Sequence, residues 1–357
     1  MDLLDRLDAL LLTNPTNIRY LTGFVGAAPD EREAYVCLTK KQTFLFTSSL
    51  YREKAKALKG VTIVEISRDE PFAKKLAETF QGNRLGFEET DLTVAEHHKL
   101  MQVHKNVMLV PTQGRVEELR MMKREDEIKN IRAAAKLTDQ CFKFLLNKMK
   151  PGVTEGAIAW EIESFIRTRG AQLAFSPIVA FGKNTSQPHY QSSDVRLQSS
   201  DLILLDFGAK VNGYCSDMTR VVSVGKPKDK WKRAYNAVFD AQHAALEYLH
   251  LEGVKAHLPG DVRRSGAAVD RIAREVIEKS GFPVYPHSLG HGVGLAIHEA
   301  PRLTIKKDQI LKPNMVVTVE PGIYVEGSYG IRIEDLVLLK KDGIEILSTS
   351  KKEMTIL

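Results

Sequence analysis

The sequence predicts an α+β fold divided into two domains, a smaller α/β domain at the N-terminus and a larger domain after it. The chain has 357 residues, which is more than one hydrophobic core usually serves. Residues 1–114 alternate short strand-like and helix-like segments, whereas residues 115–357 begin with long helical segments and continue with strand-like runs that end in acidic residues. We therefore expect the domains to cover residues 1–114 and 115–357.

The composition is that of an ordinary globular protein, with 43% hydrophobic and 27% charged residues and a net charge of +6. No basic run is interleaved with aromatic residues, so we expect no binding of nucleic acid. The three cysteines lie far apart, which predicts neither a disulfide framework nor a thiolate metal site and is typical of a reducing compartment. The N-terminus carries acids where a signal peptide carries bases, and no apolar run reaches membrane-spanning length. We expect a cytoplasmic protein without a membrane contact.

The first domain alternates strands and helices. Strands are predicted at Ala9–Leu12, Ala34–Thr39, Thr43–Thr47, Val61–Ile66 and Arg84–Phe87. Helices are predicted near Tyr51–Leu58, Glu70–Phe80 and Thr93–Leu100. Residues 13–23 are rich in turn formers and predict a loop, which either reaches a neighbouring active site or closes a tight connection. The domain contains no histidine before His97 and no recognisable catalytic constellation.

The second domain opens with helices after a boundary at residues 111–114. The segment Val116–Met149 is charged on one face and apolar on the other, and Pro151 with Gly152 ends it. Thr154 is a plausible N-cap for a further helix that runs to residue 169. Two more helices are predicted near Lys230–Glu252 and Val262–Lys279.

A β-hairpin is predicted at residues 202–221, where the Asn-Gly pair at 212–213 separates two strand-like runs. In an ideal two-residue turn Asp206 faces Thr219, and Asp217, two residues from that partner, points to the same face of the sheet. Two carboxylates this close repel each other unless one is protonated or a cation lies between them. The hairpin therefore predicts bound metal ions.

Three histidines, His287, His291 and His298, follow in a glycine-rich stretch. A lone histidine is more often structural, but three at spacings of four and seven, with glycines that let the backbone approach closely, favour a site. The strand-like run at 315–319 then ends in Glu320, as the earlier run ends in Asp206.

The last acidic residue of interest follows Gly330. Arg332 and Glu334 are two residues apart in a strand-like run, so we expect them on one strand face. A carboxylate within an Ile/Val/Leu strand is informative, because an unpaired buried charge is very costly.

These segments together offer four carboxylates and one imidazole, namely Asp206, Asp217, His291, Glu320 and Glu334. Four negative charges match two divalent ions. Oxygen-rich ligation with one nitrogen favours Mn²⁺, Co²⁺ or Fe²⁺, with Zn²⁺ as a further candidate. Two metal ions about 3.5–4 Å apart would hold a bridging hydroxide as nucleophile and polarise a carbonyl oxygen, which is the usual arrangement for hydrolysis.

The chain resembles the pita-bread metallopeptidases, and within them most closely the prolidase and aminopeptidase P branch. The motifs that match are the Asp206 and Asp217 pair, Gly290-His291-Gly-Val-Gly-Leu, His298-Glu, Glu320-Pro-Gly-Ile-Tyr and Arg332-Ile-Glu334-Asp. Residues 17–24, Asn-Ile-Arg-Tyr-Leu-Thr-Gly-Phe, match the signature of the branch's N-terminal domain. The resemblance implies a C-terminal pita-bread (creatinase/aminopeptidase) fold with a smaller N-terminal creatinase-like α/β domain.

The resemblance also implies a role for each ligand. Asp206 would bind one metal ion, whereas Asp217 and Glu334 would bridge both. His291 and Glu320 would complete the other ion's ligand set, and Glu320 would also take the proton of the attacking water.

Other residues match the substrate side of the family's site. His189 and His298 would stabilise the tetrahedral intermediate. Arg332, by resemblance a catalytic residue, and Tyr324, by resemblance a substrate-binding one, match positions around the ligands. His287 would either lie around the ligands, as Arg332 and Tyr324 do, or serve only in packing.

The implied reaction is cleavage of the Xaa-Pro bond in dipeptides or short peptides by a homodimeric exopeptidase. Arg302 matches the arginine that compact prolidases aim at the dipeptide's carboxylate, although it could equally be a solvated loop arginine. One departure from the family weakens the dipeptidase reading, and a second concerns the pocket wall or the dimer contacts, to which residues 47–51 contribute in the family. Such prolidases take a histidine from the partner's N-terminal domain, and none precedes His97 here. Residues 47–51 also lack the Asp and Arg that relatives carry around the tyrosine.

Three alternatives share this fold. A methionine aminopeptidase has the five ligands but normally lacks the N-terminal domain, and removal of an initiator Met from model peptides would reveal it. A creatinase-type hydrolase loses the metal carboxylates, which are all present here. A non-catalytic pita-bread module that binds peptides also lacks ligands, so metal analysis of the purified protein would distinguish it.

Overall fold

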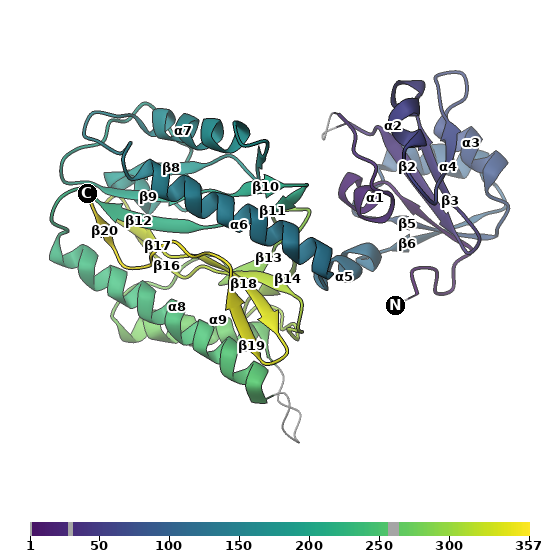
Figure 1. Ribbon diagram of the computed structural model, residues 1–357. Helices are drawn as coiled ribbons and strands as arrows, with labels where there is room; N and C mark the ends of the chain where they lie inside the picture. The colour runs from purple at the N-terminus through teal and green to yellow at the C-terminus, as the bar shows by residue number, and fades with distance from the viewer. Residues whose placement is uncertain (1, 28–30, 256–263) are drawn as a thin grey trace. The chain divides into compact units, whose positions relative to one another are not determined.

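The computed structural model describes residues 2–27, 31–255 and 264–357. The chain forms two compact units, Met1–Arg120 and Met121–Leu357 (Figure 1). The predicted boundary at residue 114 lies where helix α5 (Arg115–Met121) begins, and the first unit includes most of that helix.

The first unit contains a six-stranded mixed sheet in the order β4-β3-β2-β1-β5-β6. Its strands are β1 (Ala9–Leu12), β2 (Ala34–Thr39), β3 (Thr43–Thr47), β4 (Thr62–Glu65), β5 (Arg84–Glu88) and β6 (Met108–Thr112). The five predicted strands are confirmed. Strand β6 was not predicted, because Pro111 indicates a break; β6 is an edge strand, where a proline is tolerated.

Helices cover both faces of this sheet. They are α1 (Pro15–Thr22), α2 (Arg52–Lys56), which follows a short 3₁₀ helix η1 (Ser49–Tyr51), α3 (Phe72–Thr79) and α4 (Val94–Val103). Neighbouring residues of β1 point to opposite faces, so Leu10 packs in a core with α1 and α2, whereas Leu11 packs in a second core with α3 and α4. The predicted small α/β domain is confirmed.

Helix α1 corrects the loop predicted for residues 13–23. The Asn14 side chain caps this helix by accepting hydrogen bonds from two backbone amides, and Pro15 occupies its first turn. Gly23, with φ +78°, ends it. The turn formers of this segment are thus the residues that begin and end a helix of only eight residues.

The second unit contains the long helices α6 (Glu125–Leu145), α7 (Glu155–Arg167), α8 (Asp229–Lys255) and α9 (Gly266–Lys279). The single helix predicted for residues 116–149 is wrong, because residues 122–124 interrupt it between α5 and α6. The backbone N–H of Lys123 donates instead to the carbonyl of Asn314. The predicted start of α9 at Val262 lies outside the described residues.

Within the part of this unit that the structure describes, the strands form four sheets, in the orders β20-β12-β9-β8, β14-β13-β15-β18-β19, β11-β10-β7 and β16-β17. Their bounds are β7 (Gln172–Leu173), β8 (Ile178–Phe181), β9 (Leu202–Asp206), β10 (Ala209–Val211), β11 (Tyr214–Cys215), β12 (Thr219–Ser223), β13 (Gly290–Gly292), β14 (Glu299–Leu303), β15 (Val316–Val319), β16 (Gly322–Val325), β17 (Tyr329–Arg332), β18 (Asp335–Lys340), β19 (Gly343–Ile346) and β20 (Thr355–Ile356). A 3₁₀ helix, η2 (Gly182–Ser186), follows β8.

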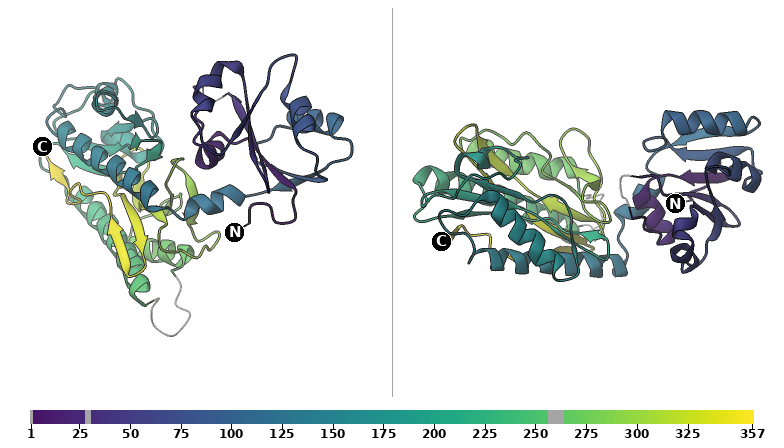
Figure 2. Two further views of the ribbon diagram at one scale, coloured as in Figure 1. Left: turned by 45° about the vertical axis from the view of Figure 1, so that its right-hand side comes forward. Right: turned by 90° about the horizontal axis from the view of Figure 1, so that it is seen from above.

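The larger sheets lie between two helix layers, α6 with α7 and α8 with α9 (Figure 2). Strand β9 contributes to both cores by alternation. Its residues Ile203 and Leu205 pack with α6 and α7, whereas Leu202 and Leu204 pack with α8, α9 and the five-stranded sheet. The same alternation places Asp206 on the face of Leu204, toward the five-stranded sheet. Among the described residues, no helix combines the length and apolar character that crossing a membrane requires.

The predicted hairpin register is confirmed, since Asp206 pairs with Thr219 and the turn consists of Asn212 and Gly213, with φ of +49° and +88°. The hairpin is not one continuous ribbon, however. Strands β9 and β12 pair in one sheet, β10 and β11 in another, and Asp217 lies in an irregular segment between β11 and β12. The expectation that Asp217 lies in a strand is therefore wrong.

Candidate metal centre

A cavity of about 300 Å³ in the second unit collects the acidic strand ends. Nine of the ten predicted site residues line it, namely His189, Asp206, Asp217, His291, His298, Arg302, Glu320, Arg332 and Glu334. The tenth, Tyr324, accepts a hydrogen bond from Arg332 at 2.7 Å through its hydroxyl oxygen. The predicted residues therefore form one site.

The fold brings the five candidate ligands together from short strands and from the connections that follow them. Asp206 is the last residue of β9, Glu320 directly follows β15, and Glu334 lies between β17 and β18. His291 is in the middle of β13, beside β15 in the same sheet. The close approach of these strands requires glycine before the histidine, since a Cβ on Gly290 would lie 1.9 Å from the carbonyl oxygen of Thr318.

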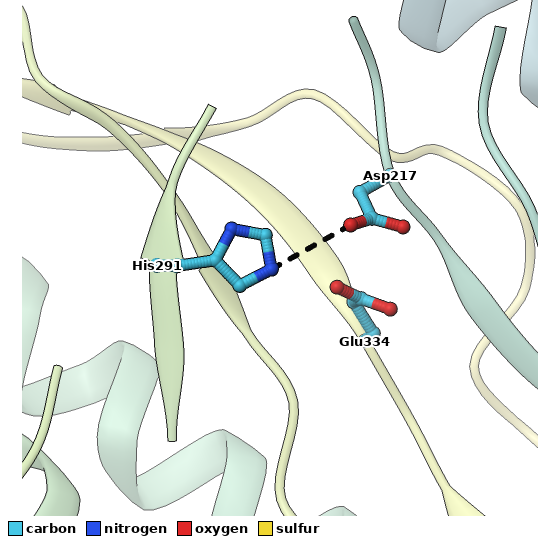
Figure 3. A group of neighbouring side chains, drawn as sticks. All are labelled: Asp217, His291 and Glu334. Atoms are coloured by element: carbon cyan, nitrogen blue, oxygen red, sulfur yellow. Dashed lines mark ion pairs between the residues drawn. The ribbon is translucent and has the colours of Figure 1, made fainter. Parts of the chain in front are cut away.

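Asp217, His291 and Glu334 point toward one another from three separate segments (Figure 3). One potential ligand atom from each lies within 4.8 Å of the others. The Nε2 atom of His291 is 3.7 Å from Asp217 Oδ2 and 3.4 Å from Glu320 Oε1. Donor atoms this close, one nitrogen and several carboxylate oxygens, form a group that could hold a metal ion.

The His291 ring has the tautomer that a metal ligand needs. Its Nδ1 lies 3.1 Å from the carbonyl oxygen of Gly292, which can only accept a hydrogen bond, so Nδ1 carries the proton and Nε2 presents a lone pair to the carboxylates. Burial lowers the pKa of His291 to about 3, which keeps the ring neutral. The His298 ring stacks edge-on against it at 4.5 Å between centroids.

The carboxylates are not satisfied by protein donors alone. Burial, followed by repulsion from the neighbouring carboxylates, raises the pKa of Asp217 and of Glu334 well above the usual range. Burial likewise raises the pKa of Glu320 to about 7. Among the described residues, the buried Oδ1 atoms of Asp206 and Asp217 find no hydrogen-bond donor. Unpaired buried carboxylate oxygens are costly, and divalent cations would satisfy them, so this donor set fits metal ions.

One buried cation does contact the acidic cluster. Arg332 donates to Asp206 Oδ2 at 2.5 Å and, through Nε, to the hydroxyl of Thr219 at 3.0 Å. Thr219 in turn donates to Glu334 Oε2 at 2.6 Å. A single guanidinium cannot balance four carboxylates.

The expectation that Arg332 and Glu334 share one strand face is wrong, because β17 ends at Arg332 and Glu334 lies in the connection to β18.

The remaining wall of the cavity carries both polar and apolar groups. His189, His298 and Arg302 supply the polar groups. The apolar wall consists of Phe175, Ile178, Pro188 and Ile297. His287 also lines the cavity, and its Nε2 lies 3.0 Å from the Tyr324 hydroxyl.

Sequence reasoning missed two threonines that hold the candidate ligands. Thr318 accepts a hydrogen bond from the backbone N–H of His291 at 3.0 Å and donates to Glu320 Oε1 at 3.1 Å. Thr219 orients Glu334, as described above. Both had a signal in the sequence, since Thr219 is the predicted partner of Asp206 and Thr318 is two residues before Glu320 on a strand.

Comparison with known families gives two matches that together cover most of the chain. Residues 129–341 match the model of metallopeptidase family M24. Residues 5–122 match the model of the creatinase/prolidase N-terminal domain.

Several proteins are similar over nearly the full length. The uncharacterized peptidase YqhT of Bacillus subtilis is 40% identical over 355 residues, which are 98% of this chain and 96% of that protein. The structure of an Xaa-Pro dipeptidase from Bacillus anthracis is 37% identical, with a TM-score of 0.88 over 98% of this chain and 95% of that one. An X-Pro aminopeptidase from Thermotoga maritima, 32% identical with a TM-score of 0.88, is covered completely, as is this chain. A prolidase from Pyrococcus furiosus is 31% identical, with a TM-score of 0.84 over 97% of this chain and 98% of that one.

Proposed function

The chain belongs to metallopeptidase family M24, and we propose that it hydrolyses the Xaa-Pro bond of dipeptides or short peptides. The pita-bread fold with a creatinase-like N-terminal domain, as predicted, is confirmed by the two family matches. Similar solved structures are those of an Xaa-Pro dipeptidase, an X-Pro aminopeptidase and a prolidase, which supports proline-containing substrates.

The proposal rests on one observation, the convergence of four carboxylates and one neutral imidazole in a single cavity. We assign two divalent ions, Mn²⁺ or Co²⁺ before Fe²⁺ or Zn²⁺, to Asp206, Asp217, His291, Glu320 and Glu334. When bound, such ions supply Lewis acidity and lower the pKa of water, which is the chemistry that peptide hydrolysis needs.

The protein's own groups would do the remaining work. Glu320, held by Thr318, takes the proton of the attacking water. His189 and His298 face the same cavity and donate hydrogen bonds to the oxygen that becomes negative as the carbonyl carbon turns tetrahedral. The apolar wall around Phe175 and Ile178 would receive the prolyl ring.

Substrate assays test this function directly. With Mn²⁺ or Co²⁺, we expect Ala-Pro or Ala-Pro-Ala to be cleaved at the Xaa-Pro bond with a kcat/KM at least about 10-fold above that for Ala-Ala. Preferred release of methionine from Met-Ala peptides would instead indicate a methionine aminopeptidase. Binding of these peptides without turnover at any metal concentration would indicate a non-catalytic module.

Replacing Arg302 should lower kcat/KM more for dipeptides than for longer substrates. It is exposed, lies on β14 and lines the cavity, where its guanidinium can bind the carboxylate of an Xaa-Pro dipeptide. We expect Arg302→Ala to lower kcat/KM for Ala-Pro about 10- to 100-fold, the size of a lost charge-assisted hydrogen bond, because the carboxylate then has no cationic partner. Ala-Pro-Ala, whose carboxylate lies one residue farther away, should lose less than about threefold.

The control for Arg302 is Lys306→Ala, which removes the same charge from an exposed position four residues along the chain and should leave both activities unchanged. Equal losses for the dipeptide and the tripeptide would reject the carboxylate-binding role of Arg302.

The homodimer and the cytoplasmic location stay predictions from the sequence.

A further inference from the structure

We propose that Glu155 is a positioning residue for His189, which it holds at the cavity through the chain segment 181–193. This inference rests on the proposed function, in which His189 contacts the substrate. Glu155 is the first residue of α7 and is fully buried, with 0% of its surface exposed. It does not line the cavity, so it must act through the segment that does.

From the described residues the Glu155 carboxylate accepts five hydrogen bonds, each of them from this segment. Oε1 accepts from the backbone N–H of Phe181 at 2.8 Å and from the side-chain amide of Asn184 at 2.9 Å. Oε2 accepts from the Tyr190 hydroxyl at 2.9 Å and from Ser193, whose backbone N–H and hydroxyl lie at 3.1 and 2.7 Å. The first two donors precede His189 in the chain and the other three follow it.

His189 itself has little else to fix its position. Its side chain is exposed, and no described residue forms a hydrogen bond with its ring. The neighbouring Pro188 and Tyr190 are only half-buried. The position of the imidazole is therefore set by the backbone on either side of it, and Glu155 ties both sides to the start of one rigid helix.

Only a carboxylate suits this arrangement. It accepts hydrogen bonds at both oxygens, whereas an amide of the same shape would direct two N–H groups toward donors that already face Glu155. Five hydrogen bonds to one buried charge also compensate its loss of water. The Tyr190 hydroxyl additionally accepts from Asn184 at 2.8 Å, which links the two sides of the segment directly.

A double-mutant cycle with His189 distinguishes positioning from general structural support. We expect Glu155→Gln to lower kcat for Ala-Pro about 10-fold, with a smaller change in KM, because a displaced catalytic group costs rate more than binding. In the His189→Ala background the same substitution should change kcat less than about twofold, since the group that it positions is absent. The affinity for Mn²⁺, measured by calorimetry, should stay within about twofold of that of the unsubstituted protein, as the proposed ligands lie on other segments.

The matched control is Glu127→Gln. Glu127 is also a buried carboxylate in the first turn of a helix, α6, and also accepts a tyrosine hydroxyl, that of Tyr214, at 3.1 Å. It has no hydrogen bond with segment 181–193. We expect this variant to lose stability but to keep its kcat.

The measured kcat values distinguish a positioning role of Glu155 from general structural support. Equal losses caused by Glu155→Gln with and without His189 would overturn the positioning role, as would an unchanged kcat. Full activity of His189→Ala alone would instead reject the proposed function of His189. If Glu155→Gln does not fold, Ser193→Ala removes one of the five hydrogen bonds from a half-buried position. It should lower kcat about two- to fivefold, again only when His189 is present.

Discussion

Replacing Glu320 by glutamine should lower kcat for Xaa-Pro hydrolysis by about 10²- to 10⁴-fold, which is the usual contribution of a general base. The amide keeps the size of the side chain and one carbonyl oxygen, but it cannot take the proton of the attacking water. It also removes one of four repelling buried carboxylates, so we expect the variant to fold with an unchanged circular dichroism spectrum and a Tm at least as high as that of the unsubstituted protein without metal. Steady-state kinetics in saturating Mn²⁺ measures the loss.

Glu326→Gln is the matched control for this substitution. Glu326 is six residues farther along, exposed in the turn between β16 and β17, and outside the cavity. The control variant should keep full activity. Turnover by Glu320→Gln within a few-fold of normal would contradict the assignment of Glu320 as the base.

Removing metal ions should abolish activity and lower the Tm by about 5–10 °C. Ligands that bind only the folded state stabilise it by about 2.7 kcal/mol at 100 times their Kd, and about 2–4 °C of Tm corresponds to each kcal/mol for a unit of this size. The physical reason is local, since without cations the carboxylates of Asp217 and Glu334 lie close together in a buried site, where burial and then repulsion from Glu334 raise the pKa of Asp217. Calorimetry after chelation, and again after adding Mn²⁺ or Co²⁺, measures both the fall and the recovery.

His291→Ala provides the comparison for metal removal. It deletes the imidazole but leaves all four carboxylates, so its Tm should respond much less to added Mn²⁺ than that of the unsubstituted protein. An identical rise in Tm in both proteins would show that the ion binds elsewhere.

The secondary structure near the site was largely predictable because its signals are local. The Asn-Gly turn fixes the register of the hairpin, and the register fixes Asp206 opposite Thr219. The alternation in β9 then turns Asp206 to the same side as Leu204. In the first unit, β2, β3 and β4 were equally clear, because runs rich in β-branched and aromatic residues between turn formers have few other solutions.

The errors arose where tertiary contacts override a continuous local pattern. The break between α5 and α6 depends on the backbone of Lys123 pairing with Asn314, about 190 residues away in sequence, which no periodicity reveals. Asp217 was assigned to a strand because nothing local shows that β11 and β12 belong to different sheets. Helix α1 was missed because the turn formers Asn14, Pro15 and Gly23 lie at both ends of a helix of only eight residues.

Within the site, the identities of the candidate ligands could be predicted from the sequence, whereas the hydrogen bonds that hold them could not. Carboxylates within or at the end of apolar strand-like runs indicated Asp206, Glu320 and Glu334. The spacing of the hairpin indicated Asp217, and the glycine-rich stretch indicated His291. The strand positions of Thr219 and Thr318 were predictable, but only the fold shows that their hydroxyls donate to Glu334 and Glu320. The role of Glu155 was equally hidden in the sequence, because its hydrogen bonds to the segment around His189 form only in the folded protein.

The metal content of the protein tests the central claim most directly. After chelation, incubation with Mn²⁺ and removal of free ion, elemental analysis should find two ions per chain, and fewer than one in an Asp217→Ala variant, since Asp217 is assigned to both ions. Two ions bound equally by the variant, or none bound by the unsubstituted protein, would contradict the account.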